Sequence, residues 1–347
     1  MDEEKVDGKP RIVWIDLVRV IGALLVVMIH VNSQALRDWG EIPLSWWMVK
    51  NIFNATARIA VPLFFMVSGY LLLQKNEDIF VFFRKRGFKI LLPFLAWSVI
   101  FLIALDKAQT PREFVVRILT DRVAAHLWFL YPLIGIYLVV PFLRVFTSPD
   151  KKIYLYFFVG MWVIAQPVYA MLEKSLGEPI AFPLSFFEGY VGYFILGYLL
   201  GQIKVNQRVL AVGGIVWLAA ALFTILITYY LTAEKGKFNG IYYTYLQPNI
   251  ILASVGAYLL LMWAGEWEIF QKPGLQKVIV LVSQTSFGIY LIHPLVMKML
   301  RSLTDQVDAW IANPVWGTPL VTLLVFGLSF AATILLQKVP LVKRLVP

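Results

Sequence analysis

Long apolar runs, separated by short polar connections, occur along the whole sequence. A helix needs about 20 apolar residues to cross the hydrocarbon core of a bilayer, and ten runs approach this length. The chain is therefore predicted to fold as an all-α bundle of about ten transmembrane helices, in a single domain over residues 1–347 with no separate soluble domain. The ten predicted spans are Ile12–Asn32, Asn51–Leu73, Phe88–Leu105, His126–Phe146, Ile153–Leu172, Phe186–Ile203, Val209–Leu231, Leu246–Gly265, Lys277–Leu300 and Val315–Leu336.

The composition favours lipid over water as the surroundings of the protein. Of the 347 residues, 60% are hydrophobic and 15% are charged, whereas soluble domains carry about 25% charged residues. The absence of cysteine excludes disulfides, a thiol nucleophile and thiolate metal ligands. The formal net charge of +10 is interpreted as a topology signal or an anion site, and no nucleic-acid partner is expected. No metal is expected either.

Lys and Arg are unevenly distributed between the two sides of the predicted bundle. With the N-terminus in the cytoplasm, eighteen of them fall in cytoplasmic connections and eleven in outer ones. The positive-inside rule then places both termini in the cytoplasm. The first run is too long for a signal peptide and is predicted to remain as a span. The outer loop Asp106–Ala125 is an exception to the rule because it is basic.

Three ionisable residues occur in the first predicted span, where such groups are costly and usually face a polar interior. Arg19 and His30 are eleven residues, or three helical turns, apart; they share one face, with a rise of about 16 Å between them. Asp16 lies on the same side and is predicted to pair with Arg19. Small residues between them would form a groove for a narrow ligand. An architectural ion pair and an interfacial histidine explain the pattern equally well.

The second predicted span carries Asn54 and Arg58 at helical spacing in its outer half. Arg58 is predicted to face a polar cavity, because an unpaired guanidinium in lipid is unfavourable. Asn54 could serve the same cavity or join two helices by hydrogen bonds. Pro62 is expected to kink the helix, and Ser68 and Tyr70 follow near its cytoplasmic end.

All three histidines fall toward the outer side of the predicted bundle. His30 ends the first span, His126 begins the fourth, and His293 lies in the outer half of the ninth. They are compatible with one site that faces the outside, although histidine is also common at membrane interfaces. Tyr290 shares a helical face with His293. Glu188, at the same level, could orient a histidine, bind a sugar hydroxyl, or be a solvated carboxylate.

A compact basic run, Arg84-Lys85-Arg86, precedes the third predicted span on the cytoplasmic side. Such a run suits a polyanion, for example a phosphorylated cofactor. Positive-inside anchoring or contact with anionic lipid explains it equally well. The spacing Gly197-x-x-x-Gly201 predicts close packing between helices and implies no chemistry.

Together these residues resemble the bacterial acyltransferase 3 family. The run Trp14–Arg19, followed by His30, is similar to the Arg-x10-His signature of that family. Four further segments look like its other motifs, and they are Arg58–Leu71, Arg84–Arg86, His126–Leu130 and Ser286–Pro294. Within the family, the chain is most similar to stand-alone membrane O-acetyltransferases of surface polysaccharides, of the enterobacterial common antigen type.

The resemblance implies acetyl-CoA as the co-substrate and a glycan or lipid-linked sugar as the acceptor, in the inner membrane of a bacterium. It implies a catalytic role for His30, as general base or transient acetyl carrier, together with Arg19 and Asp16. The residues expected to bind the donor are Arg84, Lys85, Arg86, Ser68 and Tyr70. Those expected to bind the acceptor are Arg58, Asn54, His126, Trp128, Glu188, Tyr290 and His293. The expected partners are the lipid bilayer and the acceptor, and homo-oligomerisation is left open.

Two alternatives stay open at this point. Ten spans with charges inside the bundle also suit a transporter or flippase for a glycan or lipid, although the sequence shows no internal repeat of the kind many transporters have. A succinyl-CoA-dependent acyltransferase would have the same fold and similar motifs. Transfer of label from acetyl-CoA to a glycan distinguishes the acetyltransferase from both.

Overall fold

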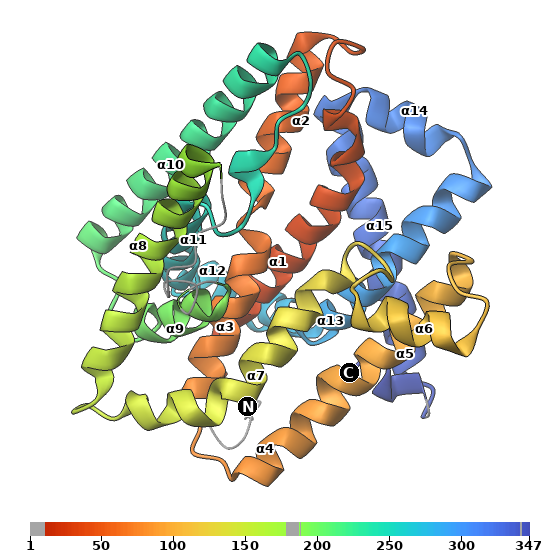
Figure 1. Cartoon of the computed structure of the whole chain (residues 1–347). Coiled ribbons are helices and arrows are strands. Elements are labelled where there is room, and N and C mark those ends of the chain that lie inside the picture. Colours follow the sequence, from red (N-terminus) through yellow and green to blue (C-terminus); the bar gives the residue numbers. More distant parts are fainter. Residues whose placement is uncertain (1–10, 178–186, 188, 341) are drawn as a thin grey trace.

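The computed structural model describes residues 11–177, 187, 189–340 and 342–347. These residues are mostly helical and include no β-strand, so the predicted all-α membrane bundle is confirmed (Figure 1). Eight helical segments among them are long and apolar enough to cross a membrane. They are α1 (Val13–Asn32), α2 (Leu44–Ala57) with α3 (Ala60–Leu73), α4 (Ile79–Arg86) with α5 (Leu92–Ala104), α7 (Leu130–Arg144), α10 (Gln207–Lys235), α11 (Pro248–Ala264), α13 (Pro273–Leu303) and α15 (Pro314–Gln337).

Two shorter apolar segments coincide with the remaining two predicted spans; they are Lys152–Val168, within α8 (Lys152–Leu176), and α9 (Val191–Leu200). The described part of the chain thus has a helix for each of the ten predicted spans. Three short helices in the connections were not predicted, namely α6 (Pro111–Leu119), α12 (Glu268–Gln271) and α14 (Gln306–Ala312). They are too short to cross a bilayer.

Two helical segments begin at least seven residues earlier than the predicted spans. The second begins at Leu44 rather than Asn51, and the third at Ile79 rather than Phe88. A π-helical turn over Gly87–Leu91 joins α4 to α5 without a break. The basic run Arg84–Arg86 therefore lies in the last turn of α4, on the same continuous helix as the third span. The apolar part of this helix follows the basic run, as predicted, while the helix itself extends back to Ile79.

The junction between α2 and α3 falls at Arg58 and Ile59, one turn before Pro62. Pro62 has no N–H group, so the Arg58 carbonyl loses its usual partner four residues later. Helical bonding resumes with the Leu63 N–H, which donates to the Ile59 carbonyl at 3.0 Å. The predicted kink is confirmed, and it leaves Arg58 at a bend in the helix.

The helix α1 lies at the centre of the bundle (Figure 1). It packs against α13, α3, α15, α2 and α11, and its Val18 and Val27 are completely buried. Large apolar side chains on the outer helices are exposed, as lipid-facing residues should be; examples are Ile103, Leu138, Ile153, Ile215 and Leu335. Polar side chains on α1 consequently face other helices and not the membrane.

The helices α3 and α9 pack with their backbones in contact. A Cβ atom on Gly197 would lie 2.1 Å from the carbonyl oxygen of Met66, and one on Gly69 would overlap the carbonyl oxygen of Phe194. Only glycine allows this approach. The close packing predicted from Gly197-x-x-x-Gly201 is confirmed, and it fixes Ser68 and Tyr70, the neighbours of Gly69, on the inner half of α3.

Candidate active site

The three histidines come together from three separate segments of the chain. His30 lies near the end of α1, His126 directly precedes the short 3-10 turn η3 (Leu127–Phe129), and His293 lies in α13. The ring centroids are 4.8 Å apart for His30 and His293, 5.5 Å for His126 and His293, and 6.3 Å for His30 and His126. We call these residues the histidine cluster. Their predicted convergence at one level of the bundle is confirmed.

Backbone hydrogen bonds determine which ring nitrogen of His30 and of His293 is free. The Nδ1 atom of His30 lies 2.8 Å from the Val26 carbonyl oxygen, and Nδ1 of His293 lies 2.7 Å from that of Tyr290. A carbonyl oxygen only accepts, so Nδ1 must carry the hydrogen in both rings. In its neutral form each imidazole then keeps an unshared electron pair on Nε2, which is the atom a base or nucleophile requires.

Access distinguishes His30 from the other two members of the cluster. His126 and His293 are buried, with 3% and 1% of their surface exposed, and their Nε2 atoms have no hydrogen-bond partner. His30 is only half-buried. His30 is therefore the imidazole that a substrate can reach, and the other two form its enclosed surroundings.

Tyr290 fixes the position of His126 in the cluster. Its hydroxyl donates to the backbone carbonyl of His126, and the ring of Phe101 packs 4.7 Å from the imidazole of the same histidine. The phenolic proton of Tyr290 is therefore engaged by the backbone. In this arrangement the tyrosine fixes the loop that carries His126 and does not offer a free donor to a substrate.

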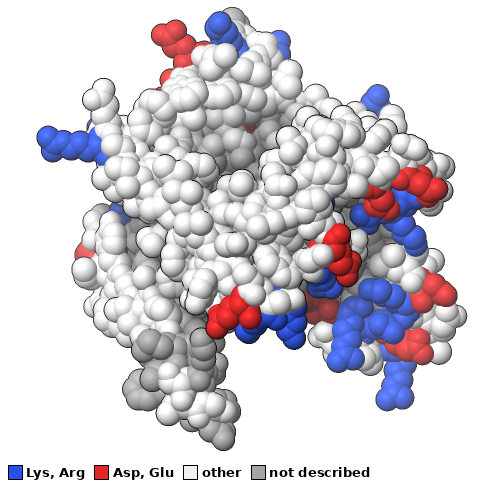
Figure 2. Space-filling view, turned by 90° about the horizontal axis from the view of Figure 1, so that it is seen from above, with Lys and Arg blue, Asp and Glu red and all other residues white. Residues whose placement is uncertain are grey.

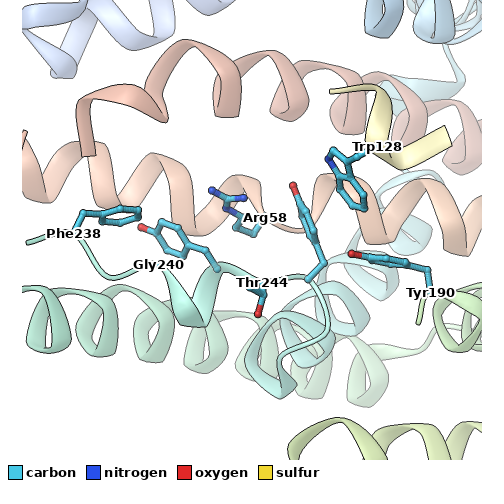
Figure 3. A pocket seen from close by; sticks show the side chains of 8 residues that line it. Arg58, Trp128, Tyr190, Phe238, Gly240 and Thr244 are labelled. Atoms are coloured by element: carbon cyan, nitrogen blue, oxygen red, sulfur yellow. The ribbon is translucent and has the colours of Figure 1, made fainter. Parts of the chain in front are cut away.

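A pocket of about 310 Å³ opens beside the cluster (Figure 3). We call it the aromatic pocket. The ring of Trp128, two residues after His126, stacks on Tyr245 at 5.3 Å with an interplanar angle of 22°. Aromatic faces of this kind suit the apolar face of a sugar ring. The residues that line the pocket are Arg58, Trp128, Tyr190, Phe238, Gly240, Tyr243, Thr244 and Tyr245.

Arg58 connects the aromatic pocket to the histidine cluster. Its guanidinium lies over the ring of Tyr243, 4.8 Å from the centroid, and its Nη2 donates to Oδ1 of Asn54 at 3.2 Å. The positive charge is close enough to act on the His30 ring. The prediction that Arg58 faces a cavity is confirmed, and Asn54 is the residue that orients it.

The predicted ion pair between Asp16 and Arg19 is not formed. Asp16 instead accepts two hydrogen bonds from Arg11, at 2.7 and 3.0 Å, and a third from the hydroxyl of Ser283 at 2.5 Å. Arg11 lies just before α1, where it can wrap around the first turn and bind both carboxylate oxygens. The prediction was wrong because helical spacing ignores partners outside the helix. Asp16 consequently links α1 to α13.

Arg19 is left half-buried and forms no ion pair within the described residues. It lies within electrostatic reach of Tyr137 on α7, which in turn interacts with Ser68 and with the charge of Arg86. Four helices, α1, α3, α4 and α7, thus bring polar groups together around Arg19, in the N-terminal half of α1. We call Arg19, Ser68, Arg86 and Tyr137 the inner polar group. Tyr70, one turn from this group, packs its ring on Trp14 at 5.0 Å.

The helical face between Arg19 and His30 is packed. Gly22, Ala23 and Val26 are buried, and the ring of Phe64 lies against Gly22, 3.1 Å from the place a Cβ atom would occupy. The predicted groove for a narrow ligand is therefore filled by side chains in this structure. A ligand that passes from Arg19 to His30 has to displace the Phe64 ring.

The basic run divides into free and engaged residues. Lys85 Nζ lies 2.5 Å from Oε1 of Glu77, and Nη2 atoms of Arg86 and Arg144 lie 3.8 and 3.7 Å from Oε2. Burial works to raise the pKa of Glu77, but the hydrogen bond from Lys85 and the three positive charges outweigh it and lower the pKa below its ordinary value. Arg84 is exposed and forms no ion pair within the described residues.

Several residues of the site were missed by the sequence analysis. Tyr190, Tyr243 and Tyr245 line the aromatic pocket, and Tyr137 completes the inner polar group. Aromatic residues near span ends are ordinary in membrane proteins, so their types gave no signal. Glu188, which was expected to bind the acceptor, lies outside the described residues. Within the described residues, no group of three His, Cys, Asp or Glu side chains has the arrangement of a metal site.

Comparisons with known proteins agree with this membrane fold. A family model described as an acyltransferase domain matches residues 12–337. The chain is 25% identical over 301 residues to YfiQ of Bacillus subtilis strain 168, whose assignment as a membrane-bound acyltransferase is itself provisional. That alignment covers 80% of this chain and 78% of YfiQ. No solved structure matches the chain.

Proposed function

Because the chain belongs to the acyltransferase 3 family, we propose that it is an O-acetyltransferase that moves an acetyl group from cytoplasmic acetyl-CoA to a hydroxyl of an envelope glycan or lipid-linked oligosaccharide. The observation that carries this proposal is the position of His30. Its Nε2 is free, its ring is accessible, and it lies beside the aromatic pocket, three helical turns from Arg19. Residues 1–347 would act as one domain.

We further propose that the protein lies in the inner membrane of a bacterium with its N-terminus in the cytoplasm. The distribution of Lys and Arg supports this orientation. It would put Arg84 and Arg19 on the side where acetyl-CoA is available, and His30 and the aromatic pocket on the side where envelope glycans are assembled. The protein would then receive its donor and its acceptor from opposite sides of the bilayer.

The donor end of the site requires positive charge, because CoA carries several phosphate charges. Arg84 is exposed and without an ion pair among the described residues, so it is available to a phosphate. Lys85 and Arg86 add to the same positive surface, although both are shared with Glu77. The pantetheine arm, which is thin and uncharged, would pass Arg19 and reach His30 once the Phe64 ring has moved.

The acceptor end of the site suits a sugar. The aromatic pocket has a volume of about 310 Å³, at the lower end of the range of about 300–1,000 Å³ for small-molecule sites. Trp128 and Tyr245 offer stacked faces, and Arg58 offers hydrogen-bond donors that Asn54 orients. A sugar ring bound here would present a hydroxyl toward the adjoining histidine cluster.

The chemistry follows from the free Nε2 of His30. Acting as a general base, it takes the proton of the acceptor hydroxyl while the oxygen attacks the thioester carbonyl. The C–S bond then breaks, and the CoA thiolate receives the proton from the imidazolium. In the alternative, Nε2 itself attacks the carbonyl and carries the acetyl group briefly before the sugar oxygen takes it. Both routes need the Nδ1–H tautomer that the Val26 carbonyl fixes.

Transfer of radiolabel from acetyl-CoA to a glycan in isolated membranes tests the proposal. His30→Ala should abolish the transfer while expression and melting temperature stay normal. Leu222→Ala, on the exposed outer surface of α10, is the matched control and should transfer normally. Near-normal transfer by His30→Ala would overturn the role of His30. Label that stays on the donor while glycan crosses the membrane would identify a transporter, and preference for succinyl-CoA would identify a different donor.

A further inference from the structure

A groove of about 680 Å³ runs along α6, at the end of α5. It is lined by three arginines, Arg112, Arg117 and Arg122, together with Thr110, Glu113 and Val116. We call it the arginine groove. It belongs to the connection Asp106–Ala125, the one basic loop that the topology places outside. Figure 2 shows that, on the face seen from above, most charged side chains gather at the right-hand side, while the greater part of that face is uncharged.

The arginines of the groove keep their charge unpaired. None of the three forms an ion pair with a described residue. The one carboxylate in the lining, Glu113, lies within electrostatic reach of Arg117 but forms no ion pair with it, and it accepts the backbone N–H of Gln109 at 2.8 Å. Its own N–H donates to the Thr110 hydroxyl at 3.3 Å, so the two residues form the N-terminal cap of α6.

Asp121, between Arg117 and Arg122 in the chain, makes no ion pair within the described residues either. Its backbone has a left-handed conformation, with φ of 54°, and burial raises the pKa of its carboxyl above the ordinary value. Asp121 is not part of the lining, which contains three guanidiniums and one carboxylate. The groove is therefore positive and available to an anion.

Exposed apolar side chains adjoin the arginines on the same short helix. Val115 and Leu119 of α6 are 56% and 76% exposed, whereas Phe114 and Ile118 pack against the core of the bundle. A helix that has arginines beside exposed apolar residues is typical of the membrane interface, where acyl chains meet headgroup phosphates. The combination points to an anion that is carried by a lipid and not to one free in solution.

Two hydrogen bonds hold the segment that carries the groove in place. The hydroxyl of Tyr131 donates to the Ile118 carbonyl, and Lys107 Nζ donates to the Val123 carbonyl at 2.7 Å. Arg122 and His126 are only four residues apart, so their Cα atoms lie within about 14 Å of each other even if the chain is fully extended. A phosphate in the groove would thus hold an attached sugar within reach of the cluster.

We propose that the arginine groove binds the phosphate or diphosphate group of the membrane lipid that carries the acceptor glycan. This inference rests on the proposed acetyltransferase function and names the class of its acceptor. The lipid tail would lie along Val115 and Leu119, the phosphates would bind Arg112, Arg117 and Arg122, and the first sugars would extend over the histidine cluster toward the aromatic pocket.

Direct binding of a radiolabelled polyprenyl diphosphate tests the proposal without any transfer reaction. Full-length protein is placed in nanodiscs of neutral phosphatidylcholine and compared with the triple variant Arg112→Gln, Arg117→Gln, Arg122→Gln. The variant should lose at least about tenfold in affinity, which corresponds to about 1.4 kcal/mol. The matched control is Arg301→Gln, which removes a charge that already pairs with Asp308 at 3.1 Å; it should bind as the wild type does.

Three outcomes would overturn the inference: equal binding by the wild type and the triple variant, equal loss in Arg301→Gln, or equally strong competition by phosphatidylglycerol vesicles or inorganic diphosphate. Melting temperatures show that the triple variant is folded, as expected for exposed side chains. Because no acetyl-CoA is present, this result is independent of the transfer assay. Failure of the proposed function would instead appear as normal transfer by His30→Ala.

Discussion

The carboxylate of Glu77, between α3 and α4, should stabilise one end of the bundle, and its removal should be costly. Oε2 of Glu77 lies 3.8 Å from Arg86 Nη2 and 3.7 Å from Arg144 Nη2. The same two guanidiniums flank the ring of Phe82, at 4.9 and 4.8 Å from its centroid. Glu77→Gln keeps the shape of the side chain but leaves two partly buried positive charges on either side of one ring.

The magnitude follows from distance and burial. The side chains of Glu77, Arg86 and Arg144 are 10%, 14% and 12% exposed. Unit charges at such distances attract by about 4 kcal/mol at an effective dielectric constant near 20, and breaking a buried pair typically costs about 3–5 kcal/mol after desolvation is included. Lys85, the third partner, is 53% exposed, and an exposed pair is worth only about 0–1 kcal/mol. Glu77→Gln should therefore cost about 3–5 kcal/mol.

The same contacts predict a pH dependence of stability. The pKa of Glu77 is lower in the folded protein than its ordinary value of 4.5. The stabilisation is therefore complete above pH 4.5 and is lost as the pH falls through the lower folded value. The wild type should lose stability in this acidic range more steeply than Glu77→Gln, which has no carboxylate to protonate.

Unfolding of the detergent-solubilised protein by SDS, followed by tryptophan fluorescence, measures these differences. Lys85→Gln is the matched control, because it removes a charge from the same network at an exposed position, and it should change the free energy of unfolding by less than about 1 kcal/mol. The reasoning would be refuted if Glu77→Gln were as stable as Lys85→Gln at neutral pH. It would also be refuted if the free energies of unfolding of the wild type and of Glu77→Gln fell in parallel on acidification.

Two further predictions concern the two ends of the site. Arg84→Ala should raise the KM for acetyl-CoA several-fold and change the free energy of unfolding by no more than about 0.5 kcal/mol, because the side chain is exposed; an unchanged KM in a transfer assay would place the CoA phosphates elsewhere. Tyr290→Phe leaves the buried carbonyl of His126 without its donor, which should cost about 1–3 kcal/mol of stability and lower kcat; a variant as stable as the wild type would contradict the role of Tyr290 in holding the loop.

Hydropathy predicted the spans well because a bilayer leaves few choices. A chain that crosses lipid must satisfy its backbone within each segment, so every long apolar run becomes a helix. The same cost explains why Arg58 and the three histidines could be assigned to the interior from the sequence. Several helices extend beyond the apolar runs, as at Arg84–Arg86, where the helix continues through the basic run.

Pairings between side chains were less predictable, because they depend on segments that the sequence places far apart. Asp16 was assigned to Arg19 from helical spacing, yet its partners are Arg11, before the helix, and Ser283, on α13. The rings of Tyr190 and Tyr245 both line the aromatic pocket, although 54 residues lie between them in the sequence. No local pattern encodes such a meeting; it follows from how the helices pack.

The packing between Arg19 and His30 bears on the proposal that the protein takes its two substrates from opposite sides of the membrane. A passage that stayed open from the inner polar group to the histidine cluster would let ions and water through the bilayer. Here Gly22, Ala23 and Val26 are buried, and the Phe64 ring lies against Gly22. A single aromatic ring can change rotamer without any rearrangement of helices. In the proposed reaction, movement of the Phe64 ring away from Gly22 would admit the thin, uncharged arm of the donor, and its return would close the path again.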